Sequence, residues 1–184
     1  RSGAVVTNLS SSRSIEEVAE RAGAPFHRAP VGEARVAQKM VEVDAVVGGE
    51  GNGGVMLPDL NLTRDAAVAA ALVLNPLAER EESLGDILAA RTRYHMVKRK
   101  VARGDVDPED IYRDMRAGVP AGADENTEDG LRLEWPDARE WLHVRPSGTE
   151  PILRLIAEAP SPERAEHLVA LAALDLELAA PIEA

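Results

Sequence analysis

Strand-like and helix-like patterns alternate along the first 50 residues of this 184-residue chain, and this order limits the possible folds more than any other feature. The run AVVTNL is typical of a buried strand, and SIEEVAERAG is typical of a helix with Ser14 as its expected N-cap and Gly23 at its end. The predicted order is strand, helix, strand, helix and strand, at residues 4–9, 14–23, 25–30, 33–42 and 44–50. Such an order favours a mixed, mostly parallel sheet between helices, an α/β/α domain whose ligands bind beyond the carboxyl ends of its strands.

Two further helices are predicted before the pattern changes. The longest apolar run, AAVAAALVLNPLA at residues 66–78, is expected to form a buried helix, and a second helix is expected at 83–90; both would cover the sheet. The apolar run is much shorter than the roughly 20 residues that a membrane-spanning helix needs, so no membrane segment is predicted.

The second half of the chain consists of strand patterns joined by turns. Strands are predicted at residues 96–101, 131–135, 141–145 and 152–157, and helices at 108–116 and from Ser161 onward. The segment GVPAGADENTEDG, residues 118–130, is interpreted as a polar link. We therefore expect a smaller α+β domain with a four-stranded sheet and two helices, and we place the two domains at residues 1–92 and 93–184.

A glycine-rich loop, GGEGNGG at residues 48–54, follows the third predicted strand. Its glycines permit close backbone contact, and Glu50 and Asn52 offer a carboxylate and an amide that suit the neutral hydroxyl groups of a sugar. The alternative is a flexible strand connection in which Glu50 is merely solvated. The spacing differs from that of a dinucleotide-binding fingerprint.

A second dense loop, RPSGTEP at residues 145–151, joins two apolar strand patterns. Arg145 provides a planar fork of charged donors, Ser147 and Thr149 provide hydroxyls, and Gly148 lets the backbone approach an anion. These groups together indicate a phosphate-binding loop. The alternative is an ordinary tight turn, because proline, serine and glycine are common in turns.

Composition excludes several kinds of site. The formal charge of −11 argues against a broad nucleic-acid surface, and the absence of cysteine excludes disulfides and thiolate chemistry. The four histidines have no tight ligand spacing, so no metal site is predicted. The basic run VKRK, residues 97–100, is interpreted as a solvated strand, with a phosphate-lined cleft as the alternative, and Trp135 and Trp141 as core residues rather than sugar-stacking platforms.

The segments VVGGEGNGGVMLPD and WLHVRPSGTEPILRLIAEA, in this order and at this separation, resemble the third and fourth domains of the α-D-phosphohexomutases. The resemblance covers nearly the whole chain. It implies a cytoplasmic enzyme that interconverts hexose 1-phosphates and 6-phosphates, phosphoglucosamine or phosphomannose first among them. The implied route runs through a phosphoserine and a hexose 1,6-bisphosphate, with Mg²⁺.

The resemblance also implies roles for individual residues. Arg145, Ser147, Gly148 and Thr149 would bind the phosphate that is not transferred, while Glu50 and Asn52 would bind sugar hydroxyls. Many members carry a histidine where this chain has Gly54, so the proton-transfer group is left unassigned. Further contacts to sugar or phosphate are implied for Arg13 and Glu33, although a charge at a helix start is the alternative for both.

Two motifs of the family do not occur in this sequence: the Ser-His-Asn-Pro type loop that carries the nucleophile and the Asp-x-Asp-x-Asp-Arg type loop that holds the metal. We therefore expect the chain to be the C-terminal half of a mutase, truncated at its N-terminus and inactive alone. Its expected partners are a hexose phosphate and the missing N-terminal domains. A non-catalytic sugar-phosphate binding protein and a regulatory module that kept only the fold are the alternatives.

Overall fold

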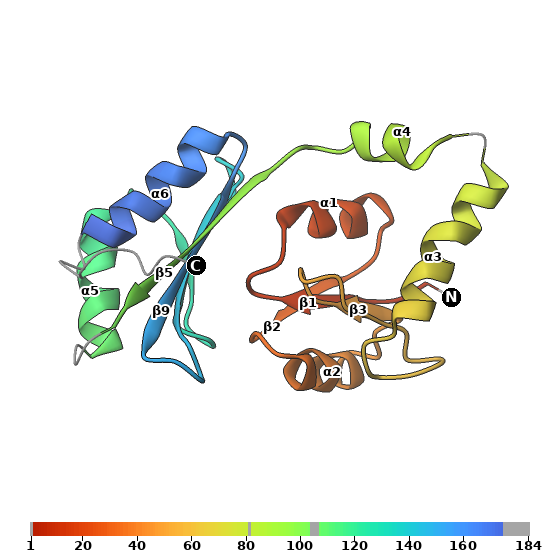
Figure 1. The fold of residues 1–184 in the computed structure, drawn as a ribbon, viewed down its shortest axis with the longest axis horizontal. Helices are drawn as coiled ribbons and strands as arrows, with labels where there is room; N and C mark the ends of the chain where they lie inside the picture. Colours follow the sequence, from red (N-terminus) through yellow and green to blue (C-terminus); the bar gives the residue numbers. More distant parts are fainter. Residues whose placement is uncertain (1, 81, 104–106, 175–184) are drawn as a thin grey trace. The chain divides into compact units, whose positions relative to one another are not determined.

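The computed structural model describes residues 2–80, 82–103 and 107–174. The chain forms two compact units, Arg1–Arg93 and Tyr94–Ala184 (Figure 1). Each unit has its own sheet and its own hydrophobic core.

The sheet of the first unit contains four strands in the order β2-β1-β3-β4. Their bounds are Val5–Asn8 for β1, Phe26–Ala29 for β2, Val47–Gly49 for β3 and Val55–Met56 for β4. The central strand β1 is parallel to β2 and β3, whereas β4 is antiparallel to β3. The expectation of a mixed, mostly parallel sheet is confirmed. The sequence did not indicate β4, because two residues are too few to show alternation.

Helices cover both faces of this sheet, with α1 on one face and α2 on the other (Figure 1). Their bounds are Arg13–Arg21 for α1 and Glu33–Glu42 for α2. Ser12, not Ser14, is the N-cap of α1, and its hydroxyl accepts a hydrogen bond from the Ser14 N–H at 3.2 Å. Three serines in a row, residues 10–12, made the position of the cap ambiguous in the sequence.

The apolar helix α3, Ala66–Glu79, is present, but the expectation that it would be buried is wrong for the residues that the structure describes. None of its side chains is buried, and Leu74 is 63% exposed. The helix is apolar all around, so its pattern carried no information about which side would pack. A short helix α4, Leu84–Ala89, follows with Ser83 as its N-cap. No described helix is long and apolar enough to cross a membrane.

The second unit contains a five-stranded antiparallel sheet in the order β5-β9-β8-β7-β6, which corrects the four strands expected from the sequence. The bounds are His95–Ala102 for β5, Asp124–Asn126 for β6, Leu131–Trp135 for β7, Glu140–Pro146 for β8 and Ile152–Ala159 for β9. The additional strand β6 lies inside the segment that was interpreted as a polar link. Its three residues are all polar, so it has no hydrophobic alternation to reveal it.

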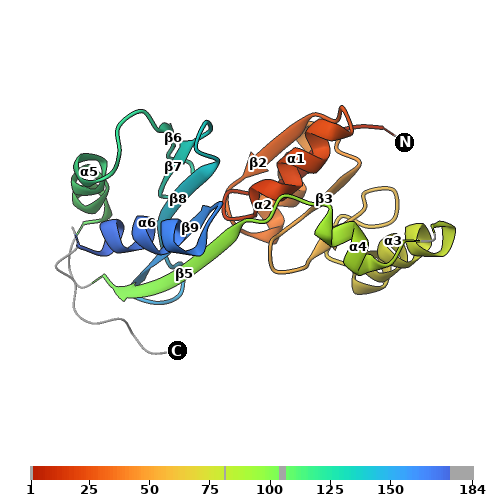
Figure 2. The ribbon, with the colours of Figure 1, turned by 90° about the horizontal axis from the view of Figure 1, so that it is seen from above.

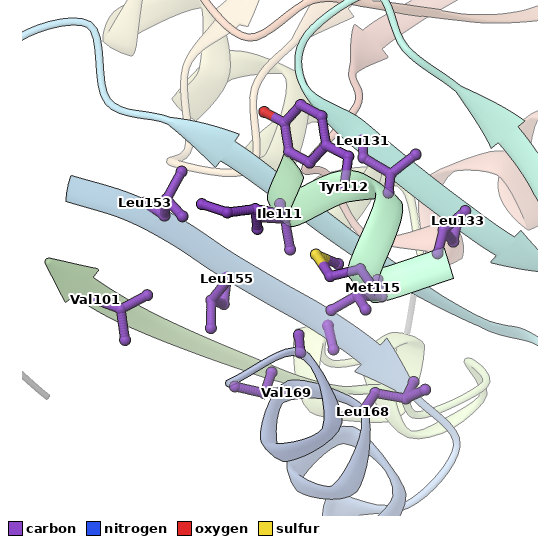
Figure 3. Packing of buried hydrophobic residues seen from close by; sticks show 14 of the residues in the cluster. Val101, Ile111, Tyr112, Met115, Leu131, Leu133, Leu153, Leu155, Leu168 and Val169 are labelled. Atoms are coloured by element: carbon purple, nitrogen blue, oxygen red, sulfur yellow. The ribbon is translucent and has the colours of Figure 1, made fainter. Parts of the chain in front are cut away.

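The two helices of this unit pack on one face of the sheet, as Figure 2 shows for α6 across β5 and β9. Their bounds are Pro108–Gly118 for α5 and Pro162–Leu174 for α6. Figure 3 shows side chains of α5 and α6 meeting those of β5, β7 and β9 in the core. Trp135 belongs to this core and Trp141 is fully buried, which confirms that neither is an exposed platform.

Alternation along β8 decides which residues face these helices. Leu142 and Val144 lie in the core, so the residues that alternate with them along the strand point to the opposite face. His143 and Arg145 therefore share the face of the sheet that is remote from α5 and α6.

Candidate functional site

Two loops, one in each unit, contain the residues that the sequence singled out. The glycine loop, residues 48–54, joins β3 to β4. The phosphate loop, residues 145–151, joins β8 to β9.

The glycine loop is a closed turn rather than a loose connection. The Glu50 N–H donates to the Gly54 carbonyl at 3.0 Å, and the Gly53 N–H donates to the Glu50 carbonyl at 3.1 Å. Gly53 has a φ of +92°, and a Cβ on Gly49 would lie 2.3 Å from the Gly54 carbonyl oxygen. The turn therefore requires glycine at these two positions and holds Glu50 in a fixed place.

The Glu50 carboxylate is anchored through one of its oxygens. Its Oε1 accepts hydrogen bonds from Asn8 Nδ2 at 2.9 Å and from the Gly32 N–H at 3.1 Å. Within the described part of the chain, Oε2 accepts none. A carboxylate held in this way offers one oriented acceptor, which suits a sugar hydroxyl.

A polar run that begins with the last residue of β1 supports this carboxylate and was missed by sequence reasoning. Asn8 is 5% exposed, and its Oδ1 accepts hydrogen bonds from the Ser10 N–H at 3.0 Å and from Ser11 Oγ at 2.9 Å. Ser11 Oγ also accepts from the Gly51 N–H at 3.1 Å, which links this run to the glycine loop. The signal was available: TNL ends a predicted parallel strand and SSS follows it, and the carboxyl ends of such strands meet at one edge of a sheet.

Asn52 is exposed at the tip of the glycine loop. Its Oδ1 accepts from the Gly54 N–H at 3.1 Å, and its amide nitrogen makes no hydrogen bond to any described residue. The amide is therefore oriented by the loop and retains two N–H donors.

Arg64 occupies the space that a side chain at position 54 would need. A Cβ on Gly54 would lie 2.1 Å from Arg64 Cδ. Arg64 Nε is 2.7 Å from Glu33 Oε2, and the Arg64 N–H donates to Glu33 Oε1 at 3.0 Å. The backbone hydrogen bond from Arg64, followed by its guanidinium, lowers the pKa of Glu33. Arg64 thus connects Glu33 to the glycine loop. Arg13 is the first residue of α1.

An apolar cavity of about 350 Å³ lies next to the glycine loop. Its walls include Val5, Val18, Val47 and Val55. Such walls offer few hydrogen-bonding groups to a sugar, so the candidate site is the polar side of the loop rather than this cavity.

The hydroxyls of the phosphate loop are only weakly engaged. The Ser147 N–H donates to the Ile152 carbonyl at 2.9 Å and fixes the base of the loop. Ser147 Oγ and Thr149 Oγ1 are 3.5 Å apart, and the Thr149 N–H is also 3.5 Å from Ser147 Oγ. A Cβ on Gly148 would meet nothing within 4 Å. These long contacts leave the loop donors open to a ligand.

Three arginines surround this loop. Arg145 and Arg154 are direct cross-strand partners on β8 and β9, and the Arg103 N–H donates to the Pro151 carbonyl at 3.1 Å. The Nε atoms of all three are buried and have no hydrogen-bond partner among the described residues. Like charges directly opposite each other on a sheet are destabilising, and a bound anion would offset that cost. Arg103 and Arg154 were not identified from the sequence, because their place depends on the strand register.

Two buried titratable groups of the same unit are neutral at pH 7. Burial lowers the pKa of His143 to about 4, and burial followed by the charges of Glu109 and Asp129 raises the pKa of Tyr112 to about 12. His143 Nε2 lies 2.7 Å from the Asp129 carbonyl oxygen, so this nitrogen carries the proton and donates. These two groups therefore add no positive charge near the loop. That charge comes from the arginines and from Lys100, the direct cross-strand partner of Arg154 on β5.

The described residues contain no group of three His, Cys, Asp or Glu side chains that could hold a metal ion. They do not fit the Mg²⁺ that the resemblance implies.

Comparison with known families agrees with this geometry. Residues 1–94 match the family described as phosphoglucomutase/phosphomannomutase, alpha/beta/alpha domain III, and residues 96–174 match phosphoglucomutase/phosphomannomutase, C-terminal domain. The chain belongs to the phosphoglucomutase/phosphomannomutase family. The resemblance noted in the sequence is thereby confirmed.

Two relatives of this mutase-family chain are considerably longer than it. A probable phosphoglucosamine mutase of Methanopyrus kandleri is 35% identical over 167 residues, which is 90% of this chain and 36% of that protein. A solved phosphoglucomutase/phosphomannomutase family protein of Burkholderia thailandensis superposes with a TM-score of 0.77 at 22% identity, covering 96% of this chain and 37% of that one. The chain thus spans about a third of the length of the relatives that it matches.

A more distant mutase has been solved with ligands. Aspergillus fumigatus N-acetylphosphoglucosamine mutase, in complex with GlcNAc-6P and magnesium, matches with a TM-score of 0.68 at 19% identity, over 94% of this chain and 41% of that chain. At this identity the likeness extends to the fold alone.

Proposed function

We propose that this chain is the substrate-recognition part of a phosphohexomutase that interconverts hexose 1-phosphate and 6-phosphate, with phosphoglucosamine as the preferred substrate and phosphomannose as the second. The observation that carries the proposal is the set of three arginines around the phosphate loop, Arg103, Arg145 and Arg154, whose buried Nε atoms make no hydrogen bond to any described residue. The family match and the phosphoglucosamine mutase of Methanopyrus kandleri support the reaction class.

The roles of the phosphate loop follow from its donors. Arg145 and Arg154 bind two oxygens of the phosphate that stays in place, and the hydroxyls of Ser147 and Thr149 bind the remaining oxygen. Gly148 leaves room for close approach of the phosphate to the backbone. This grip orients the substrate without changing it.

The glycine loop binds the hydroxyl groups of the sugar. Oε2 of Glu50 accepts a hydrogen bond from one hydroxyl, and the amide nitrogen of Asn52 donates to another. A hexosamine phosphate carries both kinds of group, hydroxyls and a phosphate. The nucleophile and the Mg²⁺ site would lie in the remaining two thirds of a full-length protein, together with the hexose 1,6-bisphosphate chemistry.

A titration of the chain with glucosamine 6-phosphate and with inorganic phosphate tests this proposal. Arg145→Ala should weaken both ligands by roughly 1.5–3 kcal/mol, the contribution of a hydrogen bond to a charged partner. Glu50→Gln should weaken only the sugar phosphate, because loss of a negative charge does not harm a bare anion. Arg113→Ala is the control, since Arg113 is 68% exposed on α5.

Two results would contradict the proposal. If Arg145→Ala binds phosphate as well as the parent chain, the phosphate loop is an ordinary turn. If Glu50→Gln weakens both ligands equally, Glu50 does not read the sugar.

A further inference from the structure

Asp129, to which the proposed function gives no role, lies directly against Arg145. Its Oδ2 is 2.8 Å from Arg145 Nε, and both side chains are only 17% exposed. Asp129 lies in the turn between β6 and β7, inside the segment that was interpreted as a polar link.

The main chain of Asp129 is fixed against β8 from two directions. His143 Nε2 donates to its carbonyl oxygen at 2.7 Å. The next residue, Gly130, has a φ of +87°, and a Cβ there would lie 2.3 Å from the Val144 carbonyl oxygen and 2.8 Å from Arg145 Cα. Only glycine permits this approach, so the turn holds the Asp129 carboxylate at a set distance from Arg145.

The contact involves only the inner nitrogen of the guanidinium. Arg145 Nε is within ion-pair distance of Asp129, yet its N–H does not point at an acceptor with hydrogen-bond geometry. The terminal nitrogens of Arg145 make no hydrogen bond to any residue in the described ranges. The carboxylate therefore acts as a charge on one side of the guanidinium and leaves the two terminal nitrogens open.

A carboxylate beside an anion site has an electrostatic cost. If only net charge mattered, Asp129 would weaken phosphate binding, because like charges repel. An arginine side chain that can move loses rotamer freedom when it binds a ligand, and this loss weakens binding. If the Arg145 guanidinium is already held in place, that loss is avoided, and the gain offsets the repulsion between Asp129 and the phosphate.

We propose that Asp129 is a positioning residue that holds the guanidinium of Arg145 in the orientation that binds the substrate phosphate. The inference rests on the proposed function of Arg145. It predicts that Asp129 favours phosphate binding although its own charge opposes it.

The sign of the effect tests this inference in the 184-residue chain, with inorganic phosphate as the probe in calorimetric titrations. Asp129→Asn should weaken phosphate binding about ten-fold, a typical coupling between contacting residues. Charge alone would produce tighter binding. Asp137→Asn is the matched control, because it removes the same charge from the exposed turn at the other end of β7 and β8, and it should change the affinity less than about two-fold.

Two further variants separate orientation from a general loss of structure. Asp129→Glu keeps the charge but moves the carboxylate, so it should also weaken binding, and it covers the case in which Asp129→Asn does not fold. In an Arg145→Lys background, which lacks the guanidinium, Asp129→Asn should no longer weaken binding.

The outcomes are distinguishable. If Arg145→Ala loses phosphate binding while Asp129→Asn and Asp129→Glu bind as tightly as the parent, the positioning role is overturned and the proposed function stands. The same holds if Asp129→Asn weakens binding equally in the Arg145→Lys background. If the parent chain does not bind phosphate, both proposals fall.

Discussion

The charged residues at the two loops differ in how they are held by hydrogen bonds. Glu50 of the glycine loop is held by two hydrogen bonds from its own unit, through Asn8 and Gly32. At the phosphate loop, Arg145 and its cross-strand partner Arg154 have buried Nε atoms that make no hydrogen bond to any described residue, although each arginine has one carboxylate within ion-pair distance. The first loop is therefore fixed by hydrogen bonds, whereas the second has cations whose charge is only partly balanced and would be balanced further by an anion. Recognition of hydroxyls needs a fixed acceptor, and recognition of phosphate needs cations with available N–H donors.

The largest effect expected from this comparison is that of Arg154→Ala. Loss of one charged partner should weaken phosphate binding by up to about 3 kcal/mol. In the absence of phosphate, the same variant should unfold at an equal or higher urea concentration, because a like-charge pair has been relieved. Urea unfolding with and without phosphate measures both quantities. A variant that is less stable without phosphate and binds it normally would contradict the contrast between the loops.

The next effect is a loss of stability at acidic pH, which should be larger in the second unit than in the first. Burial lowers the pKa of His143 to about 4 in the folded chain, from its ordinary value of 6.5. Below pH 6.5 the unfolded chain takes up a proton that the folded chain refuses, so stability is complete above 6.5 and is lost as the pH falls towards 4. Between pH 7 and pH 5 the free energy of unfolding should fall by about 2 kcal/mol.

Urea unfolding at both pH values checks this dependence. His143→Gln retains a donor for the Asp129 carbonyl but does not titrate, so it should flatten the curve over this range. An unchanged slope in that variant would place the acid sensitivity elsewhere.

The smallest effect concerns the support of Glu50. Asn8→Ala removes the donor to Glu50 and the acceptor for Ser11, and it should destabilise the first unit by about 1 kcal/mol. It should also reduce the preference for glucosamine 6-phosphate over inorganic phosphate, because the carboxylate is less well held. Asn52→Ala is the comparison: the residue is exposed, so its loss should reduce sugar binding without a change in stability. Equal stability losses in both variants would show that Glu50 is not anchored through Asn8.

The sequence was sufficient where local pattern determines structure. Short strand patterns between the predicted helices indicated three of the four strands of the first sheet, and the donors of the RPSGTE loop were recognisable from their chemistry. It was insufficient where the structure depends on register or on which side of a helix packs. Arg154 faces Arg145 only because β8 and β9 pair in one particular register. The exposure of Leu74 on α3 could not be predicted either, because that helix is apolar on every side.

The missed strand β6 had the largest consequence for the site. Asp124–Asn126 contains no apolar residue, so nothing in its pattern distinguished it from a link. Its pairing with β7 forms the turn in which Asp129 reaches Arg145. A polar segment beside a binding loop can therefore be structural support, even when it resembles a linker in sequence.

The basic run VKRK lies on an edge strand of the second sheet, where its charges have an effect that does not depend on a ligand. β5 is an outer strand of eight residues, and Lys98, Arg99 and Lys100 on it are all exposed. An open strand edge of this length is a template on which another chain can add its own strand and begin to aggregate. Two copies that approached edge to edge would bring three cations against three, so repulsion would discourage the sheet from growing beyond one molecule.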